Sequence, residues 1–102
     1  MPGVSYLQAY DHESALSIDN TAGGIGLTPS KYLSVPQAKT ATITVETAQI
    51  RWTKDGTAPT TLIGHLANVG SVIQLDNPGD ISRFRAIRTG ASSGALEVTY
   101  SR

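Results

Sequence analysis

Hydrophobic and polar residues alternate over much of the chain after Lys39, with the two-residue period of a half-buried strand. Residues 41–45 are the clearest case, because Ala41, Ile43 and Val45 alternate with two threonines. Residues 49–53 repeat the alternation with Ile50 and Trp52 on one face, and a Lys-Asp-Gly turn follows. The pattern predicts two strands that pair as a hairpin, with Trp52 buried beside Ile50.

Three further strands are predicted downstream. Residues 71–75 form a short apolar alternation that ends at Asp76-Asn77-Pro78-Gly79-Asp80, a cluster of turn-forming residues. Residues 81–88 and 95–100 are the last two strands, and the Gly- and Ser-rich segment 89–94 between them predicts a closing hairpin. Residues 62–66 fit either a strand or a single helical turn.

The first third of the chain has a different texture. Residues 1–37 mix Gly, Pro, Ser and Asn with isolated apolar residues, and Gly23-Gly24-Ile25-Gly26 invites turns with positive φ. One short strand is predicted at residues 14–19. Residues 1–13 are too short and irregular to build a core, which predicts an N-terminal arm (1–13) followed by one β-sandwich domain (14–102).

Several short strands about ten residues apart, with no convincing amphipathic helix, predict an all-β fold. We expect a single small β-sandwich or jelly-roll-like barrel with an extended N-terminal arm. A chain of 102 residues has room for one core. With 39% hydrophobic but only 6% aromatic residues, that core gives modest stability, and a partner or a second copy of the chain would add burial.

Charge and composition exclude several classes of function. Eight Lys and Arg balance eight Asp and Glu, so the weak net field disfavours nucleic-acid and membrane-surface partners. No apolar run approaches the length of a spanning helix, and the N-terminus does not resemble a signal peptide, which predicts a soluble chain. Cysteine is absent, which excludes disulfides and cysteine-type zinc sites.

No motif for catalysis or cofactor binding is recognisable. The two imidazoles, His12 and His65, lack carboxylates or further ligands at a suitable spacing, and there is no Gly-x-Ser-x-Gly elbow. The 76–80 segment lacks the EF-hand pattern, and the Gly23–Gly26 segment does not match a dinucleotide or phosphate loop. We therefore predict no catalytic residue, no metal site, no cofactor and no enzymatic activity.

Five residues are predicted to lie at a protein interface. Arg83 and Arg85 would project from one face of the predicted strand 81–88, and zero net charge favours protein contact or solvation over phosphate binding. Tyr6, Leu7 and Tyr10 would be loose apolar groups on the arm unless they dock on a partner.

Five stretches resemble small proteins encoded among the virion genes of tailed bacteriophages. These stretches are VETAQIRWT (45–53), DGTAPT (55–60), GHL (64–66), FRAIRT (84–89) and NTAGGIGLT (20–28). The resemblance spans about Ile18 to Ser101 and excludes the arm.

The resemblance implies a structural virion protein that is made in the host bacterial cytoplasm. Similar proteins often act as capsid decoration or cement proteins, which bind the outer surface of major capsid subunits, stabilise the shell and form trimers or dimers. The expected partners are the major capsid protein or other virion proteins, together with copies of the same chain. The alternatives are a neck, tail or fibre-attachment component, or a carbohydrate-binding β-sandwich module.

Overall fold

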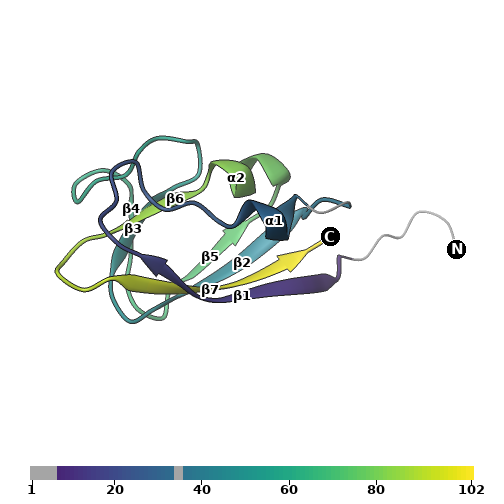
Figure 1. Ribbon diagram of the computed structural model, residues 1–102, viewed down its shortest axis with the longest axis horizontal. Helices are drawn as coiled ribbons and strands as arrows, with labels where there is room; N and C mark the ends of the chain where they lie inside the picture. The colour runs from purple at the N-terminus through teal and green to yellow at the C-terminus, as the bar shows by residue number, and fades with distance from the viewer. Residues whose placement is uncertain (1–6, 34–35) are drawn as a thin grey trace, which may run out of the picture.

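The computed structural model describes residues 7–33 and 36–102, and its strands form two antiparallel sheets that pack as a sandwich (Figure 1). Sheet A has the order β1 (Ala9–Ile18), β7 (Gly94–Ser101), β2 (Thr40–Glu46), β5 (Val72–Leu75). Sheet B has the order β4 (His65–Ala67), β3 (Ile50–Thr53), β6 (Arg85–Arg88). Two short helices, α1 (Pro29–Tyr32) and α2 (Pro78–Arg83), lie near each other at one end. The predicted all-β sandwich is confirmed.

The core lies between the two sheets and is built by the alternation seen in the sequence. Along β2 and β7 the inward side chains pair across the strands, Ile43 opposite Val98 and Val45 opposite Leu96, and none of the four is exposed. Sheet B contributes Ile50 from the other side. The remaining large buried apolar side chains are Ile18, Leu27, Tyr32, Ile73, Leu75, Ile81, Phe84, Ile87 and Tyr100.

Both predicted hairpins are wrong, because in each case the two strands belong to different sheets. β2 pairs with β5 and β7, whereas β3 pairs with β4 and β6. Between β2 and β3 the Ala48 N–H donates to the Glu46 carbonyl at 2.8 Å, with Thr47 at a φ of 74°. This tight γ-turn redirects the chain from sheet A to sheet B. β6 and β7 are likewise split between the sheets.

Residues 78–83 are helical, which corrects the predicted turn and the first half of the predicted strand 81–88. Asn77 caps the helix, since its side-chain oxygen accepts from the Asp80 N–H at 2.9 Å, and Pro78 occupies the first turn. The strand β6 begins only at Arg85. Arg83 and Arg85 therefore belong to different elements and do not share one face of a strand.

β1 begins at Ala9, so the predicted boundary between arm and domain at residues 13 and 14 is wrong. The strand pairs with β7 from Ala9, opposite Ser101, to Ile18, opposite Gly94. Within this stretch the Glu13 carboxylate accepts from the Tyr100 hydroxyl at 3.2 Å and also from Thr28. Burial raises the pKa of the Tyr100 hydroxyl, which keeps it a donor to Glu13. Residues 9–13 are therefore part of the sandwich.

Gly94, at the start of β7, is expected to tolerate no larger residue. A Cβ at this position would lie 2.6 Å from Ile50 Cγ2 and 3.1 Å from the Ala48 carbonyl oxygen. Gly94→Ala should lower the free energy of unfolding by about 1–3 kcal/mol, as overpacking does. Gly90→Ala is the matched control, because a Cβ there meets nothing within 4 Å. Urea titrations followed by Trp52 fluorescence compare the two variants, and equal midpoints would contradict the prediction.

Candidate interaction surface

The predicted arm residues do not form a free tail where the structure describes them. Tyr6 lies outside the described residues, and Leu7 is half-exposed. Tyr10 is part of β1, where its hydroxyl donates to the Lys31 carbonyl at 2.7 Å. The Arg102 guanidinium lies 4.0 Å from the centre of the Tyr10 ring, a cation–π contact. Tyr10 thus connects β1 to α1 and to the last residue of the chain.

The two predicted arginines lie apart from Tyr10. Arg83 is exposed in the last turn of α2. Arg85 is partly buried on β6, and its guanidinium occupies the space that a side chain at Gly26 would fill. The structure therefore brings Tyr10 to α1 and Arg85 to the glycine turn, while Arg83 belongs to α2.

A different set of exposed apolar residues lies on β4, on β5 and on the segments beside these strands, here called the β4–β5 edge. β4 is an edge strand of sheet B and β5 is an edge strand of sheet A. The opposite edges lie close to each other, because the Arg88 N–H at the end of β6 donates to the Asp19 carbonyl just after β1 at 3.0 Å. β4 and β5 therefore lie on the same side of the sandwich. The apolar side chains of this edge are Leu62, Ile63, Leu66, Val69 and Val72, from 50% to 85% exposed.

The β4–β5 edge carries no formal charge. From Leu62 to Leu75 the only ionisable side chain is His65. Soluble proteins usually protect edge strands with charges, prolines or bulges, so an edge without them is a candidate site for protein contact. Sequence reasoning missed this surface because it treated residues 62–66 and 71–75 as ordinary short strands, and alternation does not reveal which strands lie at an edge.

The loop before β4 holds its apolar side chains outward in a defined conformation. The Thr60 hydroxyl accepts from the Leu62 and Ile63 N–H groups at 3.1 and 3.0 Å. Arg51 donates to the Thr61 and Gly64 carbonyls, each at 2.9 Å. These bonds keep Leu62 exposed on an ordered backbone, which lowers the entropic cost of binding a partner.

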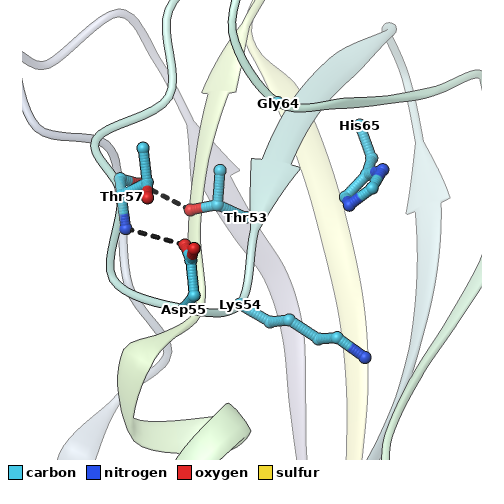
Figure 2. Close-up of a pocket in the computed structure, with 6 residues that line it drawn as sticks. All are labelled: Thr53, Lys54, Asp55, Thr57, Gly64 and His65. Atoms are coloured by element: carbon cyan, nitrogen blue, oxygen red, sulfur yellow. Dashed lines mark hydrogen bonds between the residues drawn. The ribbon is translucent and has the colours of Figure 1, made fainter.

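A hollow of about 460 Å³ lies next to this loop, at the end of β3 (Figure 2). It is lined by Thr53, Lys54, Asp55, Thr57, Gly64 and His65. The Asp55 carboxylate accepts from the Thr57 N–H at 3.0 Å, and in Figure 2 it lies apart from the His65 imidazole. His65 instead stacks on Trp52, with ring centroids 4.8 Å apart. The hollow therefore offers hydroxyl groups and an aromatic neighbour, but its acid and its imidazole are not paired.

No family model matches this chain, and neither a curated protein nor a solved structure matches it. No helix within residues 7–33 and 36–102 is long and apolar enough to cross a membrane. Over the same residues no group of three or more His, Asp or Glu side chains is placed to hold a metal ion. The function must therefore be argued from the surfaces described above.

One imidazole–carboxylate cluster lies on the outer face of sheet A. His12 Nε2 is 2.9 Å from Glu97 Oε1, and His12 Nδ1 is 2.9 Å from the Thr99 hydroxyl. Glu97 also accepts from the Ser14 hydroxyl at 3.0 Å and from the Ala15 N–H at 2.6 Å. Ala15 has a φ of 53° in the β-bulge of β1. The cluster lies away from the hollow, and its evident role is to hold this bulge against β7.

Glu97 is expected to make the stability of the domain depend on pH. The bond to His12, then the bonds from Ala15 and Ser14, lower the pKa of the Glu97 carboxyl from its ordinary value of 4.5. Because the pKa of Glu97 is lower in the folded protein than in the unfolded chain, its ionised carboxylate stabilises the fold at pH values above the unfolded pKa. This stabilisation is lost as the pH falls through the pKa of the folded protein. Glu97→Gln should therefore lose less stability than the wild type between about pH 7 and pH 3.

Urea unfolding midpoints at several pH values measure this effect. Glu46→Gln, a change to an exposed glutamate on β2, is the charge-matched control and should follow the wild-type profile. Identical acid profiles for Glu97→Gln and the wild type would show that the cluster contributes nothing to folding.

Proposed function

We propose that this chain is a non-enzymatic structural protein of a phage particle, and specifically a capsid decoration protein that binds the outer surface of major capsid subunits. The observation that carries the proposal is the β4–β5 edge, an uncharged apolar surface on a small sandwich. A surface of this kind is stable in water when another protein covers it. The resemblance to small virion proteins supports a contact within a phage particle.

The composition of the chain supports the same function. Only 16% of the residues are charged, and the net charge is zero. Such a surface provides little electrostatic steering, so its contacts depend on shape and apolar burial. A decoration protein meets this requirement because many copies bind a repeating shell, and weak individual contacts add through multivalency.

The experiment that tests the proposal is a measurement of copy number in gradient-purified phage particles. Quantitative mass spectrometry compares this chain with the most abundant shell protein. Copies approaching those of the shell protein are expected for a decoration protein. About a dozen copies would assign the chain to the neck, the tail or a fibre attachment, and absence from the particle would overturn the virion proposal.

A carbohydrate-binding module is the second candidate, favoured by the hollow at the end of β3. Its threonine hydroxyls and Asp55 are groups that bind sugar hydroxyls, and His65 stacks on the partly buried Trp52 beside it. Titration with neutral oligosaccharides, followed by Trp52 fluorescence, tests this candidate. Saturable quenching that His65→Ala abolishes would support it, and unchanged fluorescence would reject it.

A further inference from the structure

We propose that β5, the part of the β4–β5 edge that belongs to sheet A, is the seam between two copies of this chain, which pair these strands antiparallel about a two-fold axis. Sheet A would then continue through the dimer as one eight-stranded sheet. The inference rests on the proposed function, because that proposal assigns this edge to protein contact. To the proposed function it adds that the partner is a second copy of the chain, and it gives the register in which the two β5 strands pair.

On the outer side of β5, the unpaired backbone N–H and C=O groups belong to alternate residues of the strand. β5 pairs only with β2 among the described strands, with Ile43 opposite Ile73. The Val45 N–H donates to the Ser71 carbonyl at 3.0 Å, so residues 71, 73 and 75 direct their backbone groups toward β2. The N–H and C=O groups of Val72 and Gln74 therefore point away from the sheet, where another strand can bind them.

The other edge strand of sheet A, β1, is protected against pairing with a further strand, whereas β5 is not. β1 has two register shifts in its pairing with β7, between Ala9 and Asp11 and between Glu13 and Leu16. It also carries two carboxylates, Asp11 and Glu13. Bulges and charges are the usual protection against edge-to-edge pairing. β5 has neither feature, since its pairing with β2 is regular and its sequence is VIQL.

The geometry of β5 is self-complementary. A two-fold axis through Ile73 places Val72 of one copy opposite Gln74 of the other, and these residues carry the free backbone groups. The two strands would exchange about four backbone hydrogen bonds. Val72, whose side chain is 65% exposed, would be covered on the outer face. With zero net charge on each chain, no overall repulsion opposes the pairing.

The exposed apolar residues on and near β5 could add to the area that the paired strands bury. Leu62, Ile63, Leu66 and Val69 precede β5 in the chain and are 50% to 85% exposed. Together with Val72, these side chains expose on the order of 500 Å² of apolar surface, against about 800 Å² per partner in a standard interface. β5 itself carries no ionisable side chain, so no charge on the strand opposes its pairing with a second copy.

The oligomeric state of the purified full-length chain tests the seam. Light scattering after size exclusion should give twice the 10.7 kDa chain mass, falling toward the single mass on dilution. Val72→Lys should halve the apparent mass, because it places two ammonium groups in the seam. Ser17→Lys is the matched control, since it adds the same charge to an exposed position of β1, and it should remain dimeric.

Cysteine cross-linking tests the register even if Val72→Lys impairs folding. The native chain has no cysteine. In the proposed dimer, residue 72 of one copy lies opposite residue 74 of the other, with Cα atoms about 5.5 Å apart, within reach of a disulfide. A mixture of Val72→Cys and Gln74→Cys chains should therefore cross-link on oxidation far more than either chain alone. Equal cross-linking in all three samples would overturn the register.

The outcomes separate this inference from the proposed function. A chain that is monomeric at every concentration, or a Val72→Lys variant as dimeric as the wild type, overturns the seam. If such a chain is nevertheless abundant in particles, the decoration role stands and the edge contacts the shell. A dimer that is absent from particles supports the seam and overturns the virion role.

Discussion

Deletion of residues 1–13 is expected to lower the free energy of unfolding by about 3–5 kcal/mol, because it removes a partly buried aromatic ring, several hydrogen bonds and half of a paired strand. The deletion removes half of β1, including the Tyr10 ring and the Glu13 carboxylate. It leaves the Tyr100 hydroxyl without its acceptor and exposes part of β7. Many small domains are stable by only about 5–15 kcal/mol, so a large loss of folded protein follows.

Urea unfolding followed by circular dichroism measures the effect. A chain that begins at Leu7 is the matched control, because it retains the whole of β1, and it should unfold close to the full chain. If the chain lacking residues 1–13 unfolds at the same midpoint, residues 9–13 contribute nothing and the domain begins near Ser14 after all.

Phe84→Ala is expected to lower the free energy of unfolding by about 3–5 kcal/mol, the cost of a large cavity in a core. Phe84 is fully buried between α2 and β6, and its ring stacks on Trp52 with centroids 6.0 Å apart. The loss should also change Trp52 fluorescence in the folded protein.

Two controls separate the cavity from a general effect of truncation. Phe84→Leu keeps most of the volume and should cost less than half as much as the alanine variant. Leu62→Ala removes an apolar side chain that is 85% exposed, and it should change stability by no more than about 0.5 kcal/mol. Equal losses for Phe84→Ala and Leu62→Ala would mean that Phe84 is not a central core residue.

The sequence alone determined the fold class and much of the core. Alternation at Ala41, Ile43 and Val45 and again at Leu96, Val98 and Tyr100 identified side chains that the structure buries completely. The glycine-rich segment was correctly assigned to a turn, where Gly23 and Gly24 have positive φ. These features are local, because a two-residue period fixes which face of a strand is apolar and a missing Cβ permits left-handed backbone.

The helix α2 was also encoded locally, but its signal was misread. Asn77 followed by Pro78 is a helix start, with a capping side chain and a proline in the first turn. The prediction gave more weight to the alternation of Arg83, Phe84 and Arg85, and so extended a strand through residues 81–88. The predicted interface role of Tyr6, Leu7, Tyr10, Arg83 and Arg85 stays a prediction, with Tyr10 on β1, Arg83 on α2 and Arg85 on β6.

Only the tertiary structure decided which strands share a sheet and which strands lie at an edge. Residues 41–45 and 49–53 have the same alternation because both face one core, and nothing local shows that they face it from opposite sheets. Strand order arises from pairing between segments far apart in the chain, such as Ala9 with Ser101. The β4–β5 edge follows from that order, because a strand such as β5 exposes its backbone only when no neighbour lies beyond it.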